Sequence, residues 1–191
     1  MGAVNDELAV TFAVSKASNK ARKEILDRAA AHSADLSAID TAVAELRATN
    51  WSPTYDETAA QLRTRQRAAV VEEVAIREAV DQWFNHVATV DWPLARDAAY
   101  QECEKAKADV EKRLLSIGYQ KVFDLGDGVE RSDLPAMIAA HPSVRAAVVQ
   151  SNSLIDHGTL ARRQANAVAL DACRKQLASY QMQATSGLAA A

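Results

Sequence analysis

The chain has 191 residues with 22 basic and 25 acidic side chains, a net charge of −3. This length suits one domain with a real core, and the charge lacks the basic excess that nucleic-acid phosphates demand. Forty residues are alanine, against six glycines and four prolines, and this composition favours α-helix almost throughout.

The first part of the chain predicts two helices. Residues 5–31 form the first, with Asn5 or Asp6 as its N-cap, and His32-Ser33 breaks the pattern weakly. A second helical stripe follows at spacings of three and four, and the turn at Pro53 ends it. That stripe consists of Leu36, Ile39, Val43 and Leu46.

The longest predicted helix covers residues 55–90, a stretch without glycine or proline. A periodic pattern of this length is typical of a coiled coil or a long bundle helix. Asp91-Trp92-Pro93 predicts a second clear break, since proline fits the first turn of a new helix. The next helix is expected over residues 93–117, and Gly118 stands where a helix-terminating glycine belongs.

Residues 119–131 are the stretch where helical spacing gives way to alternation. Gly126-Asp127-Gly128 is a turn signal within it, so the sequence predicts a small non-helical insert in the form of a β-hairpin. Such a ribbon is marginal alone and needs a surface to pack on.

The remaining sequence predicts a short helix from Ser132 to His141, another over residues 143–154 and a last helix over residues 159–183. The fold class is therefore all-α, an elongated bundle of about five to seven helices, two or three of them long. We expect one helical domain, residues 1–183, with sub-parts 1–50, 54–118 and 132–183, and a flexible tail, residues 184–191.

Tests for catalytic and metal motifs fail on spacing. A di-iron bundle needs Glu-x-x-His pairs, but none of the four histidines has a glutamate three residues before it. The acidic turn that begins at Asp124 lacks the glycine and the final glutamate of a calcium-binding loop. Cys103 lies between two glutamates, an unfavourable place for a thiolate nucleophile, and Cys173 falls on an apolar helix side. We expect no catalytic residue, no metal and no cofactor.

Candidate interaction residues are the aromatic pair Trp83 and Phe84 and the apolar pair Val122 and Phe123. Trp83 and Phe84 would mark a partner surface if they were exposed together, and otherwise they anchor the core. Val122 and Phe123 lie in the predicted ribbon, which needs a covering surface from its own helices or from a neighbouring copy.

These features favour a non-enzymatic structural or assembly protein, which oligomerises or packs with other subunits through long alanine-rich helices. A bacteriophage virion component is one concrete form. The alternatives are a helical adaptor or regulatory module that binds protein, and a helical-bundle enzyme or ligand-binding protein without a recognisable motif. The sequence has no membrane span and no signal peptide, so we expect a cytoplasmic protein, or one within a particle assembled there.

Overall fold

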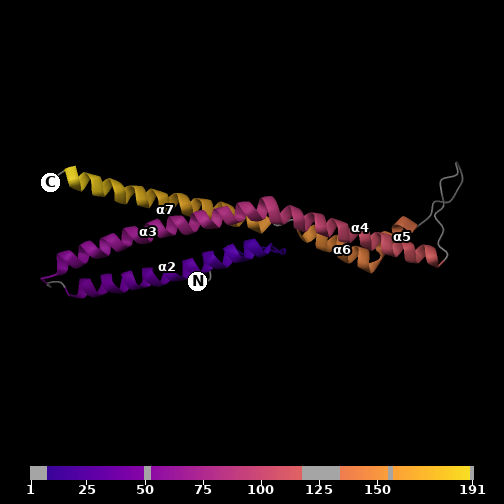
Figure 1. The fold of residues 1–191 in the computed structure, drawn as a ribbon, viewed down its shortest axis with the longest axis horizontal. Helices are drawn as coiled ribbons and strands as arrows, with labels where there is room; N and C mark the ends of the chain where they lie inside the picture. Colours follow the sequence, from indigo (N-terminus) through magenta and orange to yellow (C-terminus); the bar gives the residue numbers. More distant parts are fainter. Residues whose placement is uncertain (1–7, 50–52, 118–133, 155–156, 190–191) are drawn as a thin grey trace. The chain divides into compact units, whose positions relative to one another are not determined.

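The computed structural model describes residues 8–49, 53–117, 134–154 and 157–189, and this part of the chain is α-helical with no strand (Figure 1). The all-α prediction is confirmed. The predicted hairpin at 119–131 lies outside the described residues. The helices are α2 (Lys16–Ala48), α3 (Tyr55–His86), α4 (Trp92–Ser116), α5 (Leu134–Ala140), α6 (Pro142–Ser153) and α7 (His157–Ala189), with a π-helical segment η1 (Val87–Asp91).

Helix α2 is continuous where the sequence predicted two helices, so the predicted break at His32-Ser33 is wrong. It begins after Ser15, whose side chain accepts a hydrogen bond from the Ser18 amide, rather than near residue 5. The buried residues of α2 recur every seven positions, at Ser18, Ile25, His32 and Ile39. His32 therefore lies on the buried side of the helix, and this burial holds it in helical geometry despite its weak propensity.

The predicted break at Asp91-Trp92-Pro93 is also wrong. Helical structure continues through these residues, and only the helix type changes, from π to α. Proline has no amide hydrogen to donate, and its ring collides with the preceding helical turn, so the chain cannot pass this point in unbroken α geometry. The five π-helical residues of η1 take up that misfit, and Pro93 falls in the first turn of α4.

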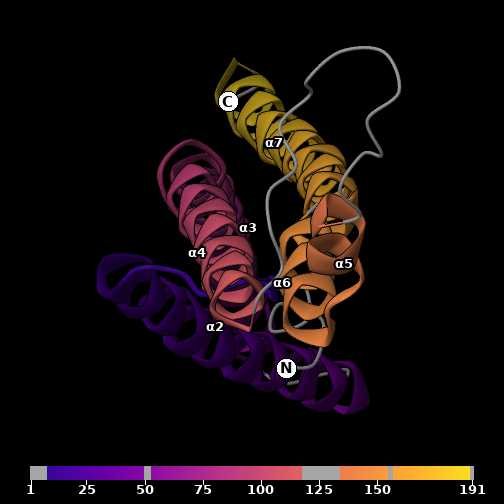
Figure 2. The same cartoon turned by 90° about the vertical axis from the view of Figure 1, so that its right-hand side faces the viewer.

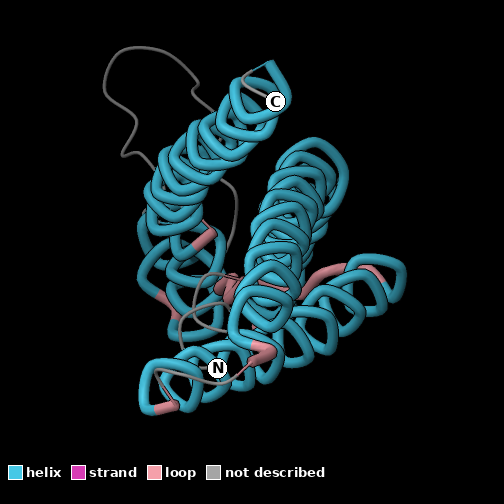
Figure 3. The backbone as a smooth tube through the Cα atoms, turned by 90° about the vertical axis from the view of Figure 1, so that its left-hand side faces the viewer, coloured by secondary structure: helices cyan, strands magenta, loops and turns pink. Residues whose placement is uncertain are grey.

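The described helices form two compact units. Unit 1 contains α2, α3 and α7, so its helices come from two separate stretches of the sequence. Unit 2 contains α4, α5 and α6, which come from the stretch between them. Figure 3 shows the described residues outside the helices as short pink segments of the backbone. The single domain expected over residues 1–183 stays a prediction.

In unit 1, α3 lies between α2 and α7 and packs against both (Figure 2). Helices α2 and α3 run antiparallel, because Trp83 near the end of α3 donates a hydrogen bond from Nε1 to the Ser18 carbonyl near the start of α2, at 2.8 Å. Four buried residues of α3 repeat the seven-residue spacing of α2: Leu62, Ala69, Ile76 and Trp83. This spacing is typical of coiled-coil packing, although a supercoil in this protein stays a prediction.

In unit 2, α4 packs against α5 and α6 over a small core. The indole Nε1 of Trp92 donates to the Leu154 carbonyl at 2.9 Å, and the Arg96 guanidinium lies 5.1 Å from the Trp92 ring centroid. The hydrogen bond between Trp92 and Leu154 fixes the start of α4 against the end of α6. The buried apolar residues of unit 2 are Ala99, Cys103, Val110, Leu134, Val144 and Leu154.

The last helix is longer than predicted. The sequence predicts that it ends at Gln183 and that residues 184–191 form a flexible tail, whereas α7 continues to Ala189. Residues 184–189 include two alanines and a leucine, which favour helix, but also Thr185, Ser186 and Gly187, so local propensity alone does not account for the extension. None of the helices in the described ranges combines the length and the hydropathy that a bilayer crossing requires.

Candidate functional site

The aromatic pair that the sequence singled out is part of the core. Trp83 is 3 % exposed and Phe84 is fully buried, with their rings 5.1 Å apart in an edge-to-face arrangement. The exposure that a partner surface would require is absent at these two residues. Both residues belong to the core, which was the other interpretation, and Trp83 joins α3 to α2 through its hydrogen bond to Ser18. Val122 and Phe123 lie outside the described residues.

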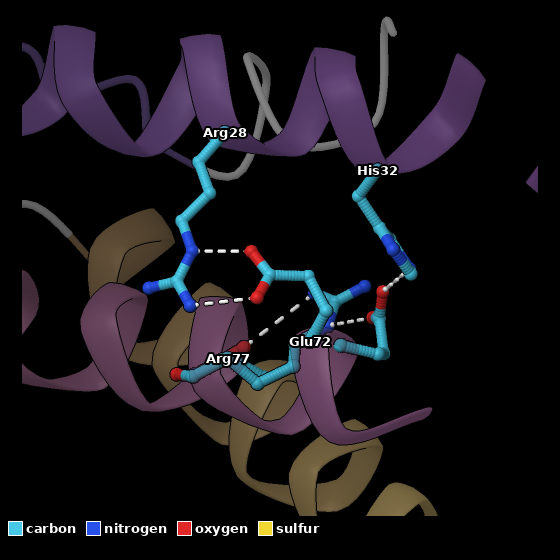
Figure 4. A network of polar contacts seen from close by, with 6 residues as sticks. Arg28, His32, Glu72 and Arg77 are labelled. Atoms are coloured by element: carbon cyan, nitrogen blue, oxygen red, sulfur yellow. Dashed lines mark hydrogen bonds and ion pairs between the residues drawn. The ribbon is translucent and has the colours of Figure 1, made fainter. Parts of the chain in front are cut away.

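A polar network crosses all three helices of unit 1 (Figure 4). At one end, Arg28 of α2 donates two hydrogen bonds to the carboxylate of Glu72 on α3, and the bond from Nη2 to Oε2 measures 2.8 Å. These hydrogen bonds lower the pKa of Glu72 and raise that of Arg28, although burial opposes both shifts. The bidentate geometry fixes how α2 and α3 are aligned along their length.

The central part of the network joins α2 to α7 through α3. His32 Nε2 lies 3.0 Å from Glu73 Oε2, and the other Glu73 oxygen accepts a hydrogen bond from Arg77 Nε at 2.8 Å. Arg77 in turn faces Asn166 of α7, whose Nδ2 donates to the Arg77 backbone carbonyl at 3.0 Å. Asn166 is fully buried, so its amide hydrogen bonds take the place of contact with water.

More charged residues of α7 point towards α3. Arg174 Nη2 donates to Glu78 Oε1 at 2.6 Å, and Arg163 contacts both Asp81, at 3.6 Å, and Asn85. Together with Asn166, these residues give α7 a polar side facing α3. Exposed ion pairs contribute little free energy each, so their main effect is to specify the alignment of the two helices.

This network has the chemistry of a structural crosslink. Its carboxylates already accept hydrogen bonds from arginine, and none of its members is a nucleophile activated by a neighbouring base. Cys173 of α7 is not an activated nucleophile either. Burial raises the pKa of its thiol, and the nearby Glu73 carboxylate acts in the same direction. Within the described ranges no three histidine, cysteine or acidic side chains come together as a metal site would need.

An open groove of about 420 Å³ lies between α2 and α3. Its apolar lining includes Ile25 and Trp83, and its charged lining includes Glu24 and Arg28. Arg28 is held by Glu72, and Glu24 lies 3.7 Å from Lys20, so these two charges already have partners within the chain. A ligand site normally offers several polar groups that converge on one point, and this groove shows no such arrangement.

The feature that the sequence analysis missed is on α7. Leu160, Val168 and Met182 are 58 %, 71 % and 72 % exposed. They lie on the side of the helix away from Asn166 and Leu170, which are buried against α3. These three residues belong to a series of exposed positions spaced three and four apart, which also includes Gln164, Asp171, Lys175 and Ala178. This helical spacing is the sequence signal that could have revealed an outward-facing side of α7.

The comparisons with known proteins give no relative from which a role could be transferred. No protein-family model matches the chain, and no curated protein or solved structure shows a significant match to it.

Proposed function

We propose that this chain is a non-enzymatic structural or assembly protein, which oligomerises or packs into a larger complex through its long helices. The observation that carries the proposal is the layered build of unit 1, in which α2 and α7 both pack on α3. Large apolar residues stay exposed on each outer helix, Leu36 on α2 and Leu160 and Val168 on α7. Further subunits would cover these surfaces.

The polar groups of unit 1 support the same proposal over an enzymatic role. Arg28, Glu72, Glu73 and Arg77 bond to one another or to Asn166, so the network rigidifies the helices instead of presenting free groups to a substrate. A rigid three-helix layer with specified alignment suits a subunit that must place its surfaces at fixed positions. The groove between α2 and α3 gives little support to the adaptor alternative, because its charged residues Glu24 and Arg28 already have partners within the chain.

A bacteriophage virion component is the concrete form of this proposal. Its support is the general build, since long alanine-rich helices without catalytic groups suit repeated copies that bury one another's faces. Sedimentation of the native protein from its source tests this form. A virion component sediments with nucleic-acid-containing particles in several copies, whereas sedimentation as a separate small protein would contradict it.

Light scattering after size-exclusion chromatography tests the broader proposal. The purified full chain, at tens of micromolar, should give a mass well above the 20.6 kDa of one chain. The mass should fall towards that of one chain on dilution, because association follows mass action. A mass of 20.6 kDa over the whole concentration range would overturn self-assembly as its function.

A further inference from the structure

Helix α7 does not separate polar from apolar residues as an ordinary surface helix does, since both of its sides carry residues of each kind. A helix that packs on only one neighbour normally turns its apolar stripe inwards and its charges outwards. In α7, Asn166 is buried against α3, and Arg163 and Arg174 bond to residues of α3. Leu160 and Val168, in contrast, are exposed on the outward side.

The outward side carries few charges. We call outer face the exposed residues of α7 turned away from α3, which are Leu160, Gln164, Ala167, Val168, Asp171, Lys175, Ala178, Ser179 and Met182. Among them only Asp171 and Lys175 are charged, and they form an ion pair one turn apart, at 2.6 Å, near the middle of the face. A mostly uncharged face of about 33 Å in length, at 1.5 Å per residue, is suited to packing against another helix.

We propose that the outer face of α7 pairs antiparallel with the same face of a second copy of this chain, about a two-fold axis next to residue 173. The proposal rests on the proposed function and names the partner that assembly uses. Charge complementarity between the two copies favours this pairing. A two-fold axis midway between Asp171 and Lys175 places each of them opposite its counterpart of opposite sign in the second copy.

The same register matches the other residues of the face. Val168 comes opposite Ala178 of the second copy, and Gln164 comes opposite Met182, so that larger side chains meet smaller or flexible ones. A parallel pairing in register would instead set Asp171 against Asp171 and Lys175 against Lys175. Like charges directly opposite each other are destabilising, and this favours the antiparallel arrangement.

Sedimentation velocity on the full chain tests whether this face makes the contact. The wild-type protein should sediment as a dimer, with twice the mass of 20.6 kDa. Val168→Glu places a new charge in the middle of the face, so it should weaken dimerisation by more than tenfold and leave helicity by circular dichroism unchanged. The matched control is Val149→Glu on α6, where the valine is 67 % exposed in the other unit. This control should dimerise like the wild type.

Charge reversal tests the orientation of the pair. Asp171→Lys or Lys175→Asp alone sets like charges opposite each other in the antiparallel dimer, so each should weaken it about tenfold. The double variant Asp171→Lys/Lys175→Asp restores opposite charges and should regain wild-type affinity. In a parallel dimer the single changes would alter little, because like charges already face each other there.

If the chain assembles but Val168→Glu assembles equally well, or the double variant fails to recover, the α7 pairing is overturned and the proposed function stands. If the wild-type chain is a monomer at all concentrations, the α7 pairing and self-assembly are both overturned.

Discussion

The hydrogen bond from Trp83 to Ser18 offers the sharpest test of how α2 and α3 are held together. Trp83→Phe keeps an aromatic ring but removes the indole N–H, which donates to the Ser18 carbonyl at 2.8 Å. That carbonyl lies within α2 and retains its helical hydrogen bond, so the loss falls in the lower part of the range for a buried group. We expect the free energy of unfolding to decrease by about 1 to 2 kcal/mol.

A second variant separates the hydrogen bond from packing. Trp83→Ala also removes the buried ring and its edge-to-face contact with Phe84, and should cost about 3 to 5 kcal/mol. Trp92→Phe in unit 2 is the matched control, because Trp92 makes the same type of bond, to Leu154, but is only half-buried. We expect its cost to be less than about 1 kcal/mol.

Urea unfolding followed by far-UV circular dichroism measures these differences. With a slope of about 2 kcal/mol per molar urea, Trp83→Phe should lower the midpoint by about 0.5 to 1 M. A Trp83→Phe variant within about 0.3 kcal/mol of the wild type would refute the reasoning. So would a Trp83→Ala variant that costs no more than Trp83→Phe.

Two further predictions concern the core and the effect of pH. Ile76→Ala, at 2 % exposure, should cost about 2 to 5 kcal/mol in thermal unfolding, while Val71→Ala on the exposed side of α3 should change stability by less than about 0.5 kcal/mol. Because Arg28 holds the pKa of Glu72 below its ordinary value of 4.5, the charged pair stabilises the fold above that pH, and this contribution is lost as the pH falls through the folded-state pKa. The stability advantage of the wild type over Glu72→Gln should therefore shrink between about pH 6 and about pH 3 in urea titrations, and a constant difference would contradict the assignment.

Much of the fold follows from composition and spacing, and the errors have identifiable causes. Alanine content and the scarcity of glycine and proline were enough to predict an all-α chain. Local propensity predicts a weak break at His32-Ser33, yet His32 occupies the buried position between Ile25 and Ile39 in α2. The sequence also predicts a break at Pro93, whereas the π-helical segment just before it allows helical structure to continue.

The polar network could not be predicted from the sequence. His32 meets Glu73, and Arg77 meets Asn166, only because of how three helices far apart in the chain are aligned. The outer face of α7 was hidden for another reason. A single apolar stripe along the last helix would include both Leu160 and Leu170, although in the structure the first is exposed and the second is buried. Two faces with similar apolar content blur the period from which a single stripe is recognised.

The discontinuity of unit 1 has a consequence for biosynthesis. On the ribosome, α2 and α3 emerge first, and α7 follows only after residues 88–156, which contain the helices of unit 2, have been made. At about 5 to 20 residues per second this takes roughly several seconds, during which Arg77 and Glu78 have no α7 to bond with. A chain terminated before His157 keeps that side of α3 uncovered permanently. Completion of α7 is thus the step that separates a finished subunit from a truncated product that proteases and chaperones would recognise.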